Sequence, residues 1–223
     1  MSSLNPPMLI LFDIDGTLVD AGGAGVAALQ DAAVEVFGGA GPPLDLAGST
    51  DGAILRGFFE YFGRQYDPAV EGGFYQSYLS RISENLQNPN HGGRLLGGVK
   101  TLLASLRKEG HFLGLLTGNI ERGAMLKVAH YGIADYFQFG AYGDDHWNRN
   151  KLGPIALERA EKSTGMRFSQ DKILVIGDTP KDVACAHAFG VKCVAVATGN
   201  FNEEELVACG ADRTVPNLEG FSL

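Results

Sequence analysis

Short apolar runs recur along the chain and are separated by longer segments of mixed polarity. Four runs of about five residues contain no charged side chain, and they fall at Met8–Phe12, Phe112–Leu116, Ile173–Ile176 and Cys193–Ala197. Runs of this length are typical of strands that are covered on both faces of a parallel sheet. They therefore predict the central strands of the fold.

Segments with helical spacing alternate with these predicted strands. Apolar residues recur at intervals of three and four in 99–106, 124–129 and 180–189, and a glycine follows each segment. A glycine at this place is a common helix stop. Strands that alternate with helices predict an α/β fold, here a doubly wound parallel sheet with a Rossmann-like core.

One long segment interrupts the alternation. Residues 19–91 show helical patterns at 26–37, 54–62 and 70–86 but no convincing strand. A segment of this length is too long for a plain loop. We therefore predict an inserted α-helical domain at 19–92, and a catalytic core formed by 1–18 and 93–223.

Charge and hydropathy restrict the partners. The chain has 18 basic and 26 acidic residues, a net charge of −8. An acidic protein lacks the basic surface that nucleic acid binding needs, but a metal or a few local cations can still bind a small phosphorylated molecule. No stretch approaches the ~20 apolar residues of a membrane span. We expect a cytoplasmic protein with no nucleic acid or membrane partner; the sequence does not indicate the oligomeric state.

Polar residues follow three of the predicted strands directly. They are Asp13 and Asp15 after the first, Thr117, Gly118 and Asn119 after the second, and Asp178 and Asp182 after the third. Ligands of open parallel sheets bind at the carboxyl ends of the strands, so these groups are expected to converge. Converging carboxylates repel one another unless a cation lies between them, and oxygen ligands suit Mg²⁺.

This set of groups suits phosphoryl transfer. Asp13 is a candidate nucleophile that would form an aspartyl-phosphate, and Asp15 is a candidate general acid and base. Thr117 and the amides beside it are placed to bind phosphate at a helix start. A further cation is needed for the charge that develops on the phosphoryl group, and Lys151 is the candidate.

The motifs DxDGT, LLTGN, a downstream lysine and GDTPxD resemble the four motifs of the haloacid dehalogenase superfamily, and the phosphoglycolate phosphatase-like branch is the most similar. The resemblance covers essentially the whole chain. It implies that Asp13 is the nucleophile and a magnesium ligand, with further ligands from the Asp15 carbonyl and Asp178 and support from Asp182. Thr117 and Asn119 would bind phosphate.

The resemblance also makes the helical insert a cap over the site. Gly48–Asp51 resembles the cap motif that points into such sites, and Ser49, Asp51, Arg56 and Arg149 are candidate substrate-binding residues. The third motif departs from the usual pattern, because Arg149-Asn150-Lys151-Leu152-Gly153-Pro154 has no proline directly after the lysine. Spacing from Pro154 favours Lys151, and Arg149 is the alternative. Asp182 also suits a helix cap after Thr179.

The sequence thus predicts a magnesium-dependent phosphatase that hydrolyses a small phosphorylated metabolite through an aspartyl-phosphate. A sugar-phosphate mutase or phosphotransferase of the same superfamily is the first alternative, and a catalytically silent binding module is the second. Carbon–phosphorus hydrolysis is disfavoured, because it would need a Schiff-base lysine in the cap and residues 19–91 contain no lysine.

Overall fold

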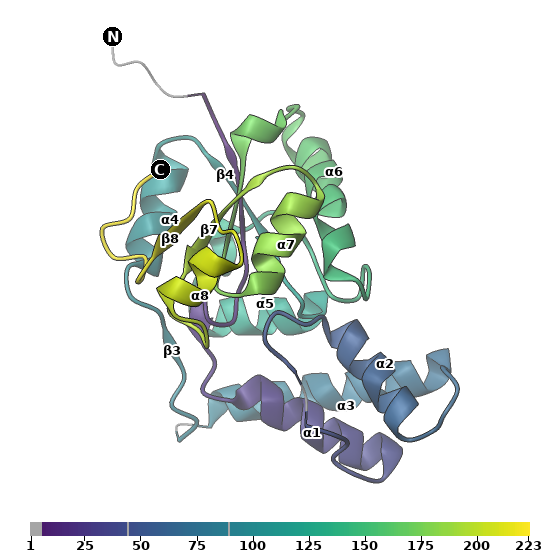
Figure 1. The fold of residues 1–223 in the computed structure, drawn as a ribbon. Coiled ribbons are helices and arrows are strands. Elements are labelled where there is room, and N and C mark those ends of the chain that lie inside the picture. Colours follow the sequence, from purple (N-terminus) through teal and green to yellow (C-terminus); the bar gives the residue numbers. More distant parts are fainter. Residues whose placement is uncertain (1–5, 44, 89) are drawn as a thin grey trace.

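A six-stranded parallel sheet forms the centre of the molecule (Figure 1). The computed structural model describes residues 6–43, 45–88 and 90–223; residues 1–5, 44 and 89, which fall in the predicted core and insert, lie outside this description. The strand order is β5-β4-β1-β6-β7-β8. The strands are β1 (Leu9–Phe12), β4 (Phe112–Leu116), β5 (Gly140–Ala141), β6 (Ile173–Gly177), β7 (Lys192–Val196) and β8 (Arg213–Val215).

Helices cover both faces of this sheet because its central strand is apolar on both sides. Along β1, Ile10 and Phe12 pack on the face of α4 (Val99–Lys108) and α5 (Glu121–His130). Leu9 and Leu11 point the other way, as alternate residues of a strand do, and pack in the cluster of the opposite face. That face is covered by α6 (Leu152–Thr164), α7 (Pro180–Ala188) and α8 (Glu203–Ala208). The predicted α/β doubly wound fold is confirmed.

Three helices lie to one side of the sheet layers: α1 (Ala24–Phe37), α2 (Asp51–Tyr61) and α3 (Pro68–Gln87) (Figure 1). They share an aromatic core in which the Phe37 ring lies 5.2 Å from the Phe59 ring and 6.2 Å from the Phe74 ring. Strand β2 (Val19–Asp20) precedes these three helices in the chain and strand β3 (Arg94–Leu95) follows them. The two strands pair as an antiparallel ribbon. The division of the chain into two domains at residues 18 and 93 stays a prediction.

The shortest elements escaped the sequence patterns. Strands β5 and β8 have two and three residues, which is too short for a periodic signal. The sequence patterns also gave no prediction for three short 3-10 turns, η1 (Ala134–Tyr136), η2 (Arg149–Lys151) and η3 (Gln170–Lys172). The longer helix α6 was not predicted either. None of the helices in the described ranges is long and apolar enough to cross a membrane.

Candidate active site

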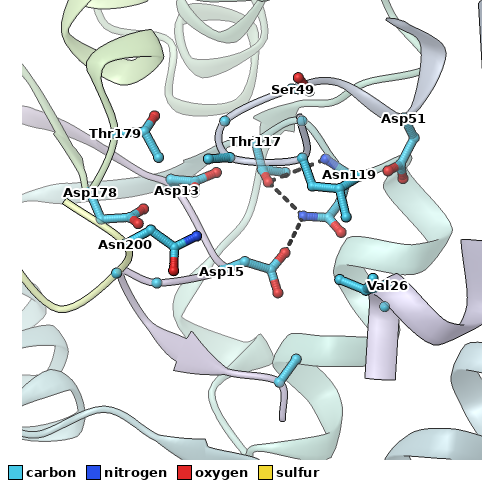
Figure 2. A pocket seen from close by; sticks show the side chains of 18 of the residues that line it. Asp13, Asp15, Val26, Ser49, Asp51, Thr117, Asn119, Asp178, Thr179 and Asn200 are labelled. Atoms are coloured by element: carbon cyan, nitrogen blue, oxygen red, sulfur yellow. Dashed lines mark hydrogen bonds between the residues drawn. The ribbon is translucent and has the colours of Figure 1, made fainter. Parts of the chain in front are cut away.

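The carboxyl ends of β1, β4 and β6 meet beneath the helical insert around a cavity of about 370 Å³. Figure 2 shows Asp13, Asp15 and Thr117 on this edge, with Asp178 beside them. Strand β1 lies between β4 and β6, so the loop that follows β1 lies between the loops that follow β4 and β6. The structure therefore brings together the polar groups that were expected to converge.

Three carboxylates form a compact cluster at the base of the cavity. One oxygen from each of Asp13, Asp178 and Asp182 lies within 4.8 Å of the others, and all three side chains are buried. Burial raises the pKa of Asp13 to about 6, although Arg149 opposes that rise. Burial, Asp182 and Asp13 also raise the pKa of Asp178 well above its ordinary value. A divalent cation would relieve this repulsion, and the all-oxygen donor set fits one.

Two glycines allow Asp178 to approach the loop after β1. Gly16 has a φ of +81°, and a Cβ on it would lie 2.2 Å from Oδ2 of Asp178. A Cβ on Gly199, in the loop after β7, would lie 1.8 Å from the same oxygen. The Thr17 hydroxyl donates to Oδ1 of Asp178 at 3.1 Å. The DxDGT motif thus supplies both the space and one hydrogen bond that fix this carboxylate.

Asp182 has a structural role as well as a place in the acidic cluster. Its Oδ2 accepts hydrogen bonds from the Thr179 backbone N–H at 3.0 Å and from the Thr179 hydroxyl at 2.7 Å. These contacts complete a capping box at the start of α7. Its other oxygen, Oδ1, pairs with Arg149. The helix cap therefore holds the carboxylate in the cluster, so the two expected roles coexist.

The cation that contacts the acidic cluster is Arg149, the alternative that the sequence left open, whereas the Lys151 side chain is exposed. Arg149 is 6% exposed and donates to Oδ1 of Asp13 at 3.0 Å, to the Leu116 carbonyl at 3.2 Å and to the Asp182 carboxylate. Burial opposes its charge, but Asp182 and Asp13 raise the pKa of Arg149 above its ordinary value. Lys151 ends the same 3-10 turn with an exposed side chain. The turn directs the first residue inward and the third to solvent.

The loop after β4 links phosphate-binding candidates to Asp15. The Asn119 side-chain amide donates to Oγ1 of Thr117 at 2.9 Å and to Oδ2 of Asp15 at 2.8 Å (Figure 2). A residue that the sequence reasoning missed completes the group, because the Lys127 ammonium lies 2.5 Å from Oδ2 of Asp15. Lys127 comes three residues after the buried Ala124 in a helix, so helical spacing places both on the same buried face. This spacing was the sequence signal that could have identified Lys127.

The segment Gly48–Asp51 docks on the loop after β4. The Asp51 backbone N–H donates to the Gly118 carbonyl at 2.7 Å, and a Cβ on Gly118 would lie 2.0 Å from the Ser49 carbonyl. The Asp51 carboxylate accepts from the Ile120 backbone N–H at 2.8 Å, and burial raises its pKa to about 7. Ser49 and Asp51 both line the cavity. The Ser49 hydroxyl also accepts a hydrogen bond from Lys181 at 2.7 Å.

Arg56 does not line this cavity, so the structure does not bring it together with Ser49 and Asp51. Its guanidinium lies 5.5 Å from the Tyr66 ring centroid and 5.4 Å from that of Trp147. These residues border a second cavity of about 240 Å³ between α2, α3 and the loop that precedes η2. Arg56 is on the outward side of α2, whereas Asp51 starts the same helix at the first cavity. Arg56 therefore connects the insert to Trp147.

The model of the haloacid dehalogenase-like hydrolase family matches residues 10–196 of this chain. The chain belongs to this family. A phosphoglycolate phosphatase of Rhodospirillum rubrum is 30% identical over 92% of this chain and 85% of its own length. One from Cupriavidus necator is 28% identical over 96% and 91%. The family and these relatives indicate that the chain is a phosphatase.

Solved structures share the fold. A predicted phosphoglycolate phosphatase from Haemophilus somnus has a TM-score of 0.70 at 20% identity, covering 98% of this chain and 97% of its own. A β-phosphoglucomutase from Clostridium difficile has a TM-score of 0.73 at 16% identity, covering 98% and 94%. At these identities the likeness concerns the fold alone, so it does not separate phosphatase from mutase.

Proposed function

We propose that this protein is a magnesium-dependent phosphatase that hydrolyses a small phosphate monoester through an aspartyl-phosphate on Asp13. The observation that carries the proposal is the buried cluster in which Asp13, Asp178 and Asp182 lie together with the Arg149 guanidinium. Burying three acids beside one cation leaves an excess of negative charge that needs a further cation. Carboxylates with space for a phosphate nearby are the donor set that Mg²⁺ prefers.

In the first step, a carboxylate oxygen of Asp13 attacks phosphorus and the bond from phosphorus to the alcohol oxygen breaks. Arg149 faces Asp13 at 3.0 Å and would hold the carboxylate in its charged, nucleophilic form. Asp15 lies two residues on, at the cavity, and would donate its proton to the departing alcohol oxygen. Thr117, Gly118 and Asn119 would bind the phosphoryl oxygens from the end of β4.

In the second step, Asp15 removes a proton from water, and the resulting hydroxide attacks phosphorus. The bond between phosphorus and Asp13 breaks, inorganic phosphate leaves, and the Asp13 carboxylate is restored. Asp13, Asp178 and the Asp15 backbone carbonyl would hold Mg²⁺, with Asp182 supporting them. A metal ion bound there would supply positive charge against the phosphate oxygens. Helices α1 and α2 border the cavity and would exclude bulk water.

The substrate class follows from the cavity and from the relatives. The cavity of about 370 Å³ suits a small molecule, and the net charge of −8 favours a metabolite over nucleic acid. Because both relatives described above are phosphoglycolate phosphatases, 2-phosphoglycolate is the first substrate to test. Ser49 and Asp51 are the substrate-side residues of the proposal, since both line the cavity.

The test is phosphate release from p-nitrophenyl phosphate, followed by a panel of phosphorylated metabolites. We expect activity with Mg²⁺, its loss when a chelator is added, and its loss in Asp13→Asn. Asp171→Asn removes an exposed acid far along the chain and is the matched control, expected to act as wild type. Undiminished turnover by Asp13→Asn would rule out the proposed nucleophile.

A further inference from the structure

Helix α5 carries a lysine in an unusual environment. Lys127 is 3% exposed, although lysine is among the residue types least often buried. A buried ammonium is costly unless charged or polar groups surround it. Lys127 also lines the proposed active-site cavity. The chemistry described above assigns it no task, so its partners call for an explanation.

The Lys127 ammonium makes two short contacts. It donates to Oδ2 of Asp15 at 2.5 Å and to Oδ1 of Asn119 at 2.6 Å. An ammonium can only donate, so it selects the carbonyl end of the Asn119 amide. The NH₂ end of that amide must then face the other way, where it donates to Asp15 at 2.8 Å and to Thr117 at 2.9 Å. The lysine therefore determines which way this asparagine points.

These contacts distinguish the two oxygens of Asp15. Both Lys127 and Asn119 donate to Oδ2. Within the described residues, no hydrogen bond to Oδ1 is present, and the Asp15 side chain is 41% exposed toward the cavity. One oxygen is thus held by two donors from the core, while the other is free to exchange a proton with a bound molecule. This asymmetry is what a general acid and base requires.

The helical insert covers the lysine. A Cβ on Gly25 of α1 would lie 3.3 Å from the Lys127 ammonium nitrogen and 4.0 Å from the Ile82 side chain of α3. The backbone of α1 can approach because glycine stands at this position. Helix α1 of the insert therefore lies directly against the Lys127 ammonium, which agrees with the low exposure of this lysine.

We propose that Lys127 is a positioning residue for the proton transfers at Asp15. It holds Oδ2 of Asp15 directly, and it orients Asn119 so that the amide holds the same oxygen. The free oxygen then faces the alcohol oxygen in the first step and the attacking water in the second. The inference rests on the proposed function, because it assigns Lys127 a role only through Asp15.

The first test is Lys127→Met, which keeps the length of the side chain and removes the charge and the donors. Misplacing a catalytic group by about 1 Å costs about 10²-fold, so kcat should fall by about 10- to 100-fold. KM should stay within about threefold, because Lys127 acts through Asp15 and not on the substrate. Arg122→Met removes an exposed cation from the same helix and should leave both constants unchanged.

A double-mutant cycle with Asp15→Asn tests the route of the effect, and the readout is kcat for phosphate release from an alkyl phosphate, whose departing oxygen needs the proton that Asp15 would donate. If Lys127 acts through Asp15, Lys127→Met should cost less than about threefold in the Asp15→Asn background. Equal losses in both backgrounds would overturn the proposal, and so would a wild-type kcat in Lys127→Met. Lys127→Gln, which retains an amide donor, is the variant to use if Lys127→Met does not fold; it should show the same coupling.

The cycle also separates this inference from the proposed function. Wild-type activity in Asp15→Asn would remove the general acid and base, and the proposed function would fail with it. A strong loss in Asp15→Asn combined with a silent Lys127→Met would leave the proposed function in place and overturn only the role of Lys127.

Discussion

Replacing Arg149 by methionine tests the assignment of the buried cation most sharply. Arg149 contacts Asp13, Asp182 and the Leu116 carbonyl from a site that is 6% exposed. Methionine has a similar length but supplies neither charge nor donors. The matched change is Lys151→Met, two residues on in the same turn, where the side chain is exposed.

The magnitude follows from these contacts. Removing one partner of a buried ion pair leaves an uncompensated charge and costs about 3–5 kcal/mol of stability. The loss of a group that stabilises charge in the transition state lowers kcat by about 10²- to 10³-fold. Arg149→Met should therefore show a lower melting temperature and a kcat reduced to this extent. An exposed substitution such as Lys151→Met typically changes stability by no more than about 0.5 kcal/mol.

The assay is phosphate release at saturating Mg²⁺, with thermal unfolding measured on the same samples. Arg149→Lys retains the charge without the two-pronged donor geometry, so it should recover part of the lost activity. The reasoning would be refuted if Arg149→Met were active and Lys151→Met instead lost activity and stability to the extent predicted for Arg149→Met. It would return the role to the lysine.

Four further outcomes are expected. Asp178→Asn should abolish the rise in melting temperature that Mg²⁺ gives the wild type, because a metal ligand is lost. Gly16→Ala should reduce activity, since its Cβ would lie 2.2 Å from Asp178; activity at the wild-type level would argue against that close approach. The pKa of Asp51 is raised from 3.8 to about 7, so its stabilising contribution is complete below pH about 4 and lost as pH rises through about 7. In metal-free protein, the free energy of unfolding measured in urea should therefore fall less between pH about 4 and about 7 for Asp51→Asn than for the wild type. Arg56→Ala should change kcat/KM for a small substrate by less than about twofold, because Arg56 borders the second cavity.

Sequence patterns identified the parts of the site that depend on local position. Asp13, Thr117 and Asp178 each follow a buried strand within the same sheet, and parallel strands bring their carboxyl ends to one edge. Once the strands were placed, convergence of these residues followed from topology. The two-residue strand β5 gave no such signal, because a pair of residues has no periodicity.

Residues whose direction depends on tertiary packing were not predictable. Arg149 and Lys151 are two positions apart in one 3-10 turn, so only the path of that turn decides which one reaches Asp13. Lys127 was missed because its partner Asp15 is 112 positions away in the sequence. Arg56 shares α2 with Asp51, and the packing of that helix turns the arginine toward Trp147. Helical spacing predicted which face of each helix is buried, but not which other elements that face contacts.

Chemical trapping of the phosphorylated aspartate tests the central claim most directly. An acyl phosphate is reduced by borohydride, which converts the phosphorylated aspartate to homoserine. The protein is mixed with Mg²⁺ and substrate, quenched during turnover, reduced and analysed by peptide mass spectrometry. The account predicts homoserine at position 13, dependent on substrate and absent from Asp13→Asn. Turnover accompanied by an unmodified Asp13, or by homoserine at another aspartate, would contradict it.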